Sequence, residues 1–330
     1  MKIFITGATG FVGTQLVQLL RDTPHELCCL VRDPNKAQAA REAGAKIVVG
    51  DLTDKASLVE GMRGCDGVAS VANLYEFWVP DRRAYIRVNV DGVRDLMEAA
   101  LETGVSKVVH VSTAAVWGNA KGPVSEQTPL GPKYIGGYIG SKRRGEEVAW
   151  NLHQTRGLPL VMVYPGAIVG PNDPKAAGQY VRNYLQGAMP ARVLTNSIFP
   201  WVHVRDVAAG VVKALEKDGN VGERYLLVAE SLTFGQINEF LTEISGVQPP
   251  RLAFPDWLTV IGAACATGVA NLIKKPPMLG MALDQIQLMK QGLAVDGSKA
   301  TRELGLRYIP IRTALEEAVA TSGVAAKSAS

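Results

Sequence analysis

Three glycines near the start of the chain constrain its fold more than any other feature. They follow residues 3–5, an apolar run that is too short for a helix and is typical of a buried strand. Apolar side chains then recur at helical spacing over residues 12–20, so the strand turns sharply into a helix. Gly7 lets the chain turn, Gly10 lets a diphosphate approach the backbone, and Gly13 lets helix and strand pack closely. The stretch predicts dinucleotide phosphates at the positive end of the helix, although an ordinary tight turn can show the same spacing.

Short apolar runs and amphipathic stretches alternate along the first half of the chain. After the first strand, the runs predict strands at 27–31, 46–49, 67–72, 105–111 and 160–164. The stretches between them predict helices at 34–43, 55–62, 83–103 and 138–153. This alternation is typical of an α/β fold with a doubly wound, Rossmann-type parallel sheet.

The pattern becomes irregular after residue 170, where several prolines interrupt it. Helices are predicted near 176–187, 206–217, 233–245 and 280–291, with a late strand at 224–228. We therefore expect a dinucleotide-binding Rossmann domain at 1–170 and a smaller C-terminal substrate-binding region at 171–322, interleaved with it. The small-residue tail at 323–330 is expected to be disordered.

Charge and cysteine content exclude several classes of function. The 35 basic and 31 acidic residues give a net charge of +4 without a basic cluster, so a nucleic-acid partner is not expected. Cys28, Cys29, Cys65 and Cys265 have neither zinc-ligand nor redox spacing, which predicts no metal site and reduced, mostly buried thiols. With no signal peptide ahead of the first strand, the chain is expected to be cytoplasmic.

The longest uncharged run covers residues 257–273 and reads WLTVIGAACATGVANLI. Its length is at the lower limit for a transmembrane helix, and it is rich in Ala, Gly and Thr. A buried helix or a lid over an apolar pocket is the favoured interpretation. Peripheral contact with a membrane is the alternative.

The end of the second strand indicates which dinucleotide is bound. An acidic side chain about 20 residues after the glycines bonds the ribose of NAD, whereas a basic one accommodates the 2′-phosphate of NADP. Arg32 ends that strand, and Lys36 can add a second positive charge. A guanidinium matches a phosphate bidentately, so NADP(H) is favoured. The alternative is NAD(H), with Asp33 on the ribose and Arg32 solvated.

Asp51 and Leu52 follow the third strand and are placed to meet the adenine edge of the cofactor. An equally good interpretation makes Asp51 the N-cap of the following helix.

Candidate catalytic residues lie in YIGSK, where Tyr138 and Lys142 share one helical face at four-residue spacing. A nearby ammonium favours the phenolate, which lowers the pKa of a tyrosine and lets it exchange the proton that accompanies hydride transfer. Thr113, at the end of the fifth strand, can bond the substrate oxygen. Ser112 is the competing candidate for that bond.

These motifs together resemble the extended short-chain dehydrogenase/reductase superfamily, in its NAD-dependent epimerase/dehydratase group. The resemblance runs from Met1 to about Thr321. It rests on TGATGFVG, GDLTD, RVNVDGVRDLMEAA, VSTAAVWG, YIGSK, YPGAIVGP and WVHVRDVAAG.

The resemblance implies that Thr113, Tyr138 and Lys142 are a Ser/Thr–Tyr–Lys catalytic triad. It implies further that Lys142 bonds the nicotinamide ribose, that residues 165–168 line the nicotinamide, and that Asn89 braces the site. The family often dimerises through a four-helix bundle, here the helices at 87–103 and 138–153, so a homodimer is expected. The expected cofactor-binding residues are Gly7, Thr9, Gly10, Phe11, Val12, Arg32, Lys36, Asp51, Leu52, Ala72, Asn73, Tyr138, Lys142, Pro165, Gly166 and Ile168.

Within the group, the chain looks most like the branch of dihydroflavonol reductases, cinnamoyl-CoA reductases, 3β-hydroxysteroid dehydrogenases and hopanoid-associated sugar-epimerase-like proteins. LVRDPNK resembles their NADP-binding strand end, and NLYEFWVPD resembles their segment beside the active site. One departure is Ser70, where many relatives carry a histidine. His203 is given a structural role by the resemblance.

The leading hypothesis is therefore an NADP(H)-dependent oxidoreductase that acts on a carbonyl or secondary alcohol of a fairly apolar small molecule. Tyr138 is its general acid or base. Large apolar side chains are expected either to line the substrate cavity or to belong to the core. They are Leu74, Tyr75, Phe77, Trp78, Trp117, Phe199, Trp201 and the 257–273 segment.

Two other hypotheses stay open. A sugar-nucleotide epimerase would keep NAD tightly bound and use Arg182, Arg192 or Arg205 for the substrate diphosphate. Ala114 and Ala115 replace the acidic pair of the dehydratases, which counts against dehydration. A non-catalytic, cofactor-sensing scaffold would be expected to lose the catalytic Tyr or Lys, and this chain keeps both.

Overall fold

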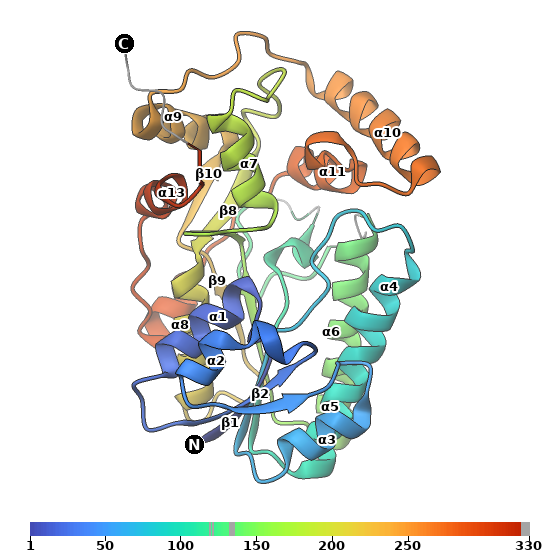
Figure 1. The fold of residues 1–330 in the computed structure, drawn as a ribbon, viewed down its shortest axis with the longest axis vertical. Helices are drawn as coiled ribbons and strands as arrows, with labels where there is room; N and C mark the ends of the chain where they lie inside the picture. The colour runs from blue at the N-terminus through green and yellow to red at the C-terminus, as the bar shows by residue number, and fades with distance from the viewer. Residues whose placement is uncertain (119, 121, 132–135, 325–330) are drawn as a thin grey trace.

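The structure is a computed structural model that describes residues 1–118, 120, 122–131 and 136–324. Its centre is a seven-stranded sheet with the strand order β3-β2-β1-β4-β5-β6-β9 (Figure 1). All six strand pairings are parallel, as the alternating sequence pattern predicted. The strands are β1 (Lys2–Thr6), β2 (Glu26–Val31), β3 (Lys46–Val49), β4 (Gly67–Ser70), β5 (Lys107–Val111), β6 (Leu160–Pro165) and β9 (Arg224–Leu227).

The glycine turn between β1 and α1 (Phe11–Leu20) has the predicted geometry. Gly7 has a φ of +75°, and a Cβ there would lie 2.8 Å from the Ala72 backbone nitrogen. A Cβ at Gly13 would lie 2.0 Å from the Gly7 carbonyl oxygen, so only glycine lets helix and strand approach this closely.

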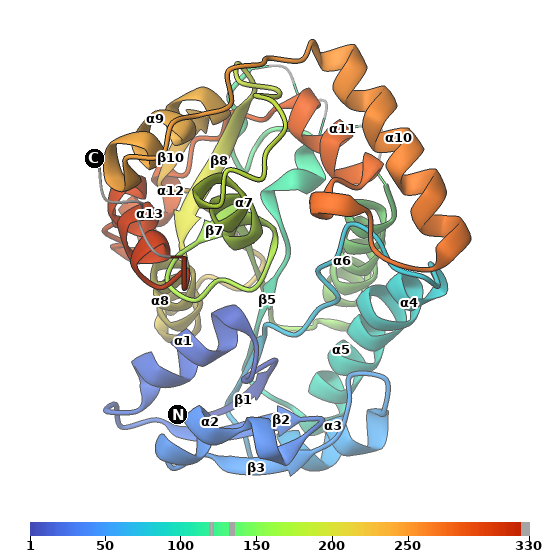
Figure 2. The same ribbon diagram turned by 45° about the horizontal axis from the view of Figure 1, so that its top comes forward.

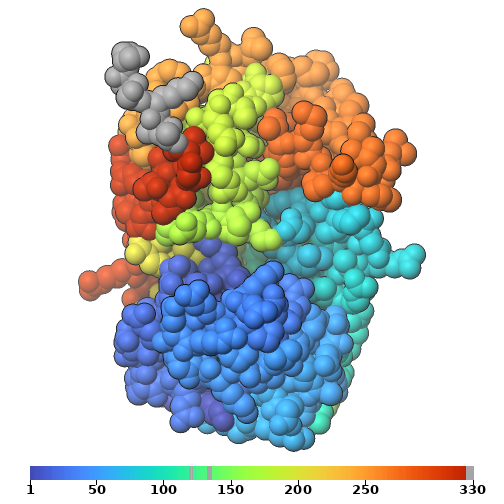
Figure 3. Space-filling model, in the orientation of Figure 1, coloured from blue at the N-terminus to red at the C-terminus, as the bar shows by residue number. Residues whose placement is uncertain are grey.

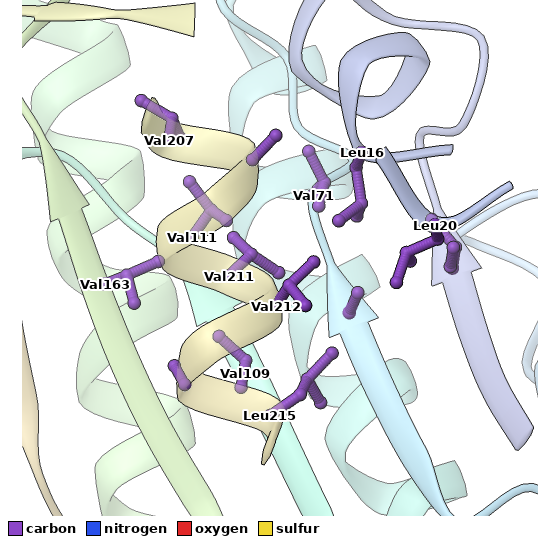
Figure 4. Packing of buried hydrophobic residues seen from close by; sticks show 14 of the residues in the cluster. Leu16, Leu20, Val71, Val109, Val111, Val163, Val207, Val211, Val212 and Leu215 are labelled. Atoms are coloured by element: carbon purple, nitrogen blue, oxygen red, sulfur yellow. The ribbon is translucent and has the colours of Figure 1, made fainter. Parts of the chain in front are cut away.

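Helices cover both faces of the sheet, which makes it doubly wound. On one face, α1 and α8 (Val204–Glu216) pack Leu16, Leu20 and Val211 onto the strands (Figure 4). On the other face lie α3 (Lys55–Met62), α5 (Gly92–Thr103) and α6 (Gly136–Arg156), whose apolar side chains form a second core cluster. Apart from the edge strand β3, the strands are buried on both faces, which explains their continuous apolar runs.

Two predicted helices are interrupted. The 34–43 stretch is a 3₁₀ turn η1 (Pro34–Lys36) followed by a short α2 (Gln38–Glu42), because Asp33 caps a turn that starts at Pro34. The 83–103 stretch comprises α4 (Arg83–Ile86), a π-helical turn η2 (Arg87–Asp91) and α5. π-Helical turns inside α-helices are frequent at functional sites.

The second half of the chain builds a smaller layer above the carboxyl edge of the sheet (Figure 2). It contains a three-stranded sheet of order β10-β8-β7, with β7 (Ala167–Val169), β8 (Ile198–His203) and β10 (Glu230–Thr233). The sequence pattern missed this sheet because its strands are short and partly polar. This layer also contains α7 (Ala176–Leu185), α9 (Phe234–Ser245), α10 (Asp256–Ile273), η4 (Met278–Gly280), α11 (Leu283–Gln291) and α13 (Ile311–Ala320). The turn η3 (Ala114–Trp117) contacts α6, and α12 (Ser298–Leu304) packs against β9 and α8.

The two halves interleave, since β9 from the second half completes the large sheet beside β6. The late strand predicted at 224–228 is therefore confirmed. Disorder of the tail stays a prediction, because residues 325–330 lie outside those described.

Candidate active site

The carboxyl ends of β1, β2, β4, β5 and β6 meet at one edge of the sheet, and the predicted site residues gather there. Parallel strands place ligands at this edge, near the point where the strand order reverses. The glycine turn lies against the end of β4, where the Ala72 amide donates to the Thr6 hydroxyl over 3.2 Å. Residues far apart in the sequence therefore gather at one edge of the sheet.

The α1 N-terminus suits a dinucleotide diphosphate. No side chain caps it, and its first turn contains no acidic residue. Thr9 and Gly10 are exposed, so the first backbone amides are open to an anion. The buried Oδ1 of Asn73 meets no donor among the described residues, which leaves it for a bound group. The residues present therefore fit a nicotinamide dinucleotide.

Arg32 is free to meet a phosphate, whereas the competing acid is engaged. The Arg32 side chain is 84% exposed, and its Nε lies 3.9 Å from Asp51 Oδ2. Asp33 accepts the amide of Asn35 and so caps η1. Lys36 ends that turn and is exposed.

Asp51 is not the cap of the next helix, because Asp54 caps α3. The carboxylate of Asp51 instead accepts from the amide and hydroxyl of Thr53. Leu52 is buried and packs beside Gly92 of α5. The helix-cap alternative is therefore removed, and contact of this pair with the adenine edge stays a prediction.

The other predicted cofactor residues lie at the same edge of the sheet. Phe11 and Val12 begin α1, while Pro165 ends β6. Gly166 approaches Pro200 of β8 so closely that a Cβ would lie 2.5 Å from the Pro200 carbonyl oxygen. Ile168 lies on β7, opposite Val202. The start of the second sheet therefore borders this edge of the large sheet.

Tyr138 lies in an aromatic enclosure formed by the segment that follows β4. Its ring centroid is 5.1 Å from that of Tyr75 and 5.6 Å from that of Phe77, both edge-on. Leu74 and Tyr85 also belong to this cluster, which is called the Tyr138 cluster below. Burial raises the pKa of Tyr138 well above the usual tyrosine value, with smaller contributions from Tyr75 and Tyr85. The expectation that Lys142 lowers this pKa is wrong here, because desolvation dominates and keeps the phenol protonated.

Lys142 joins α6 to the end of β5. Its buried Nζ donates to the Val111 carbonyl over 2.7 Å. Burial lowers the pKa of Lys142 to about 8, while the carboxylate of Glu146 partly opposes that shift. His110, also buried, has a pKa well below its usual value because of burial and the neighbouring Lys142. The imidazole is therefore neutral, and its Nδ1 lies 2.8 Å from the Ser70 hydroxyl.

The structure distinguishes the two candidates for the substrate-orienting hydroxyl. Ser112 is buried, and its hydroxyl points to Glu146 Oε2 at 3.4 Å. Thr113 is half-buried, and its hydroxyl accepts only the Ala115 amide, at 3.3 Å, among the described contacts. Thr113 is therefore the better placed of the two to donate to a substrate oxygen.

Sequence reasoning missed a buried polar network beneath Lys142. Glu146, 1% exposed, accepts from the Tyr164 hydroxyl over 2.7 Å and from Ser112. Burial raises the pKa of Glu146. The signal was present, because Tyr138, Lys142 and Glu146 repeat at four-residue spacing along one face of α6.

Asn89 braces the site from the π-helical turn, as the resemblance implied. Its side-chain amide bonds both the amide and the carbonyl of Leu74, over 2.8 and 3.1 Å. It also donates to Ser141 on α6 over 2.9 Å. One side chain therefore fixes the aromatic segment relative to the helix that carries Tyr138.

Changing Gly145 to alanine is expected to destabilise the protein by about 1–3 kcal/mol, the range for overpacking a tight core contact. The new Cβ would lie 2.1 Å from the Asn89 carbonyl oxygen, a backbone atom that cannot move without displacing η2. Thermal denaturation measures the loss. The matched control is Gly268→Ala on α10, where nothing lies within 4 Å and the midpoint should not fall. Equal midpoints for Gly145→Ala and the wild type would contradict this contact.

The large apolar residues divide between site and core. Phe199 packs against the Tyr138 cluster. Trp117 and Trp201 are core residues instead: Trp117 meets Tyr164 edge-on, and Trp201 lies in the cluster of the second sheet. Trp78 is half-buried and donates to Asn271 of α10 over 2.9 Å.

His203 has the structural role that was expected. It is fully buried, and its Nδ1 accepts the amide of Arg205, so it caps α8. Its Nε2 lies 3.1 Å from Glu317 of α13. These contacts tie the second sheet to the C-terminal helix.

An apolar cavity of about 310 Å³ lies between α7, α10 and α11. Ile286 and Met289 line it from α11, while the neighbouring Leu288 packs in the Tyr138 cluster. The cavity and Tyr138 are therefore neighbours across α11. Among the described residues, its lining contains no charged side chain; the polar ones are Gln179, Tyr180, Asn183, Thr259 and Gln285.

Comparison with known proteins identifies the family. The NAD dependent epimerase/dehydratase family profile matches residues 3–227. The chain belongs to this family. The "Putative dihydroflavonol 4-reductase" of Synechocystis sp. is 34% identical over 325 residues, which cover 96% of this chain and 93% of that protein. "Sterol demethylase protein B" of Methylococcus capsulatus is 33% identical over 331 residues, which cover 97% of this chain and 98% of that protein.

Solved structures agree with the fold. The crystal structure of gox2253 matches with a TM-score of 0.83 at 34% identity, over 97% of both chains. A UDP-glucuronic acid 4-epimerase from Bacillus cereus, crystallised with a UDP-sugar analogue and NAD, matches with a TM-score of 0.77 at 21% identity. The match covers 98% of this chain and 99% of the epimerase. The predicted membership of the extended short-chain dehydrogenase/reductases is confirmed.

Proposed function

We propose that this family member is an NADP(H)-dependent reductase of a carbonyl group on a fairly apolar small molecule. The uncharged, apolar cavity, which α11 separates from the Tyr138 cluster, carries the proposal. Relatives named as a dihydroflavonol reductase and a sterol demethylase protein support it, since flavonoid and sterol skeletons are largely apolar. The same residues would catalyse the reverse oxidation of a secondary alcohol.

The positions of the arginines favour this function over that of a sugar-nucleotide epimerase. A substrate diphosphate needs cationic partners in a site removed from water. Arg205 pairs with Glu317, and Arg182 donates to the Asp173 carbonyl, so both are engaged in the fold. Arg192 adjoins the cavity, and its buried Nε meets no acceptor among the described residues. That single nitrogen is the observation that keeps the epimerase as a second candidate.

The proposed roles follow from the geometry of the site. The bound dinucleotide supplies the hydride. Tyr138, kept protonated by burial, donates its proton to the carbonyl oxygen, which becomes the hydroxyl of the product. Thr113 orients that oxygen, and Lys142 bonds the nicotinamide ribose while its Nζ is held by Val111. Arg32 contacts the 2′-phosphate that distinguishes NADP from NAD.

Affinity for NADPH is expected to fall as the pH rises through about 8. The pKa of Lys142 is lowered to about 8, so Lys142 is an ammonium below this pH and neutral above it, where it attracts the dinucleotide less. The dissociation constant, followed by nicotinamide fluorescence, should increase by at most about tenfold per pH unit on the alkaline side. Lys142→Met should bind more weakly with a flat profile. A wild-type constant that is equally flat would remove Lys142 from cofactor binding.

Cofactor retention and substrate turnover of the purified protein distinguish the two candidate functions. A reductase should release its cofactor, bind added NADPH and consume it with a panel of apolar ketones, aldehydes and sterols. An epimerase should retain NAD through purification and interconvert UDP-sugars without consuming added cofactor. Retained NAD together with UDP-sugar turnover would overturn the reductase proposal.

A further inference from the structure

We propose that α10 docks this protein onto the surface of an anionic lipid bilayer, with the helix axis parallel to the membrane. This inference is independent of the reaction proposed above. The helix lies along the outer edge of the molecule, with α11 on its inner side in both ribbon views (Figures 1 and 2). It contains 18 residues, about 27 Å at 1.5 Å per residue.

Small side chains face the protein, and large apolar side chains face outward. The buried positions are Thr259, Ala263 and Ala270. The outer positions include Trp257, Ile261, Val269 and Leu272, with exposed fractions of 61%, 51%, 55% and 84%. This is the reverse of a helix that packs on a soluble core, where the large apolar side chains are buried. The prediction of a buried helix is therefore wrong, while α10 does cover the apolar cavity.

The exposed apolar surface continues beyond both ends of the helix. Leu252 and Phe254 precede α10 and are exposed, and Met278 follows it with 82% of its surface exposed. Leu258 of α10 both borders this surface and lines the cavity. In the space-filling view, the orange surface of this region forms the upper right of the molecule, far from the blue N-terminal end (Figure 3).

Positive charge is located where a lipid headgroup would meet it. Arg251 precedes the helix, and Lys274 and Lys275 follow it; all three are exposed. In the described part of the chain, none of the ion pairs involves these three residues. Apart from Asp256 in the first turn, the helix carries no charge. An apolar face with basic residues at both ends of the helix is typical of helices that lie in a membrane interface.

The helix is held in place, which favours a preformed docking surface. The Thr267 hydroxyl accepts the Leu283 amide of α11 over 2.9 Å. One turn later, still in the C-terminal half of α10, Asn271 accepts from Trp78. By length and composition alone, α10 could also cross a bilayer, but these inner-face contacts would then be lost. The contacts therefore favour a helix that lies on the surface.

Cosedimentation of the purified full chain with vesicles tests the proposal. The chain should sediment with vesicles of phosphatidylcholine and phosphatidylglycerol and less with phosphatidylcholine alone. A triple variant, Trp257→Gln, Ile261→Gln and Leu272→Gln, should bind at least tenfold more weakly, since these side chains lie outside the cavity lining. Lys274→Glu with Lys275→Glu should lower binding to anionic vesicles selectively.

Control variants and measurements of the oligomeric state distinguish a membrane from other partners of the exposed face of α10. Leu19→Gln with Val49→Gln removes exposed apolar side chains at the opposite end of the molecule and should leave vesicle binding unchanged. The triple variant should keep the wild-type melting temperature and NADPH affinity. Equal binding of wild type and triple variant would overturn the proposal. So would resistance of bound protein to carbonate extraction, which indicates a spanning helix, or a dimer that only the triple variant dissociates, which indicates a second copy on this face.

Discussion

Replacing Tyr138 with phenylalanine is expected to lower turnover by about 10²–10⁴-fold, the contribution of a positioned general acid. The ring keeps its edge-on contacts with Tyr75 and Phe77, so the aromatic cluster should remain intact. Only the hydroxyl that donates the proton is lost. The measurement is NADPH consumption with a carbonyl compound that the wild-type protein reduces, together with the dissociation constant for NADPH.

The control for this prediction is Tyr184→Phe. Tyr184 is a buried tyrosine whose hydroxyl bonds Thr242 in the second half of the chain, away from the Tyr138 cluster. Its loss should leave turnover close to the wild-type value. Wild-type turnover by Tyr138→Phe, with chemistry shown to limit the rate, would mean that another group supplies the proton.

Replacing Arg32 with alanine is expected to weaken NADPH binding by about 10–100-fold, because charge-assisted bonds to phosphate are among the strongest hydrogen bonds in proteins. NADH binding should change little, since NADH lacks the 2′-phosphate. The exposed guanidinium beside Asp51 gains no comparable bond elsewhere in the described structure. Parallel titrations of both cofactors against wild type and variant measure the difference.

Arg63→Ala is the matched control, because Arg63 is also exposed and pairs with one carboxylate, that of Glu60. It should not change the ratio of the two affinities. Equal losses of NADH and NADPH affinity in Arg32→Ala would show that Arg32 does not read the phosphate. A wild-type protein that prefers NADH would lead to the same conclusion.

The first half of the fold was readable from the sequence because its signals are local. The strand 46–49 and the helix 55–62 were predicted with the bounds that the structure shows. Gly7 and Gly13 were assigned correctly because a turn and a close helix–strand contact each need the absence of a side chain. The prediction of one continuous helix at 34–43 was wrong, because the cap at Asp33 starts a separate short turn that hydrophobic periodicity does not reveal.

The residues of the candidate site could be predicted from the sequence, but their burial and pKa values could not. Four-residue spacing placed Tyr138 and Lys142 on one face of α6, and the strand-end position gave Thr113. The pKa of Tyr138 could not be predicted, since it depends on Tyr75 and Phe77, which reach it from another part of the chain. Burial by distant residues reversed the shift expected from the neighbouring lysine.

The sequence by itself determined the glycine turn, the alternation of parallel strands with helices and the four-residue spacing of Tyr138 and Lys142, because these depend on residues close together in the chain. Only the tertiary structure decided which side chains are desolvated and which surfaces have no partner. The apolar run at 257–273 shows the difference: its composition suits a buried helix, yet small Ala and Thr side chains face the protein and the large ones face outward. Burial depends on contacts between distant segments, and a local pattern does not contain them.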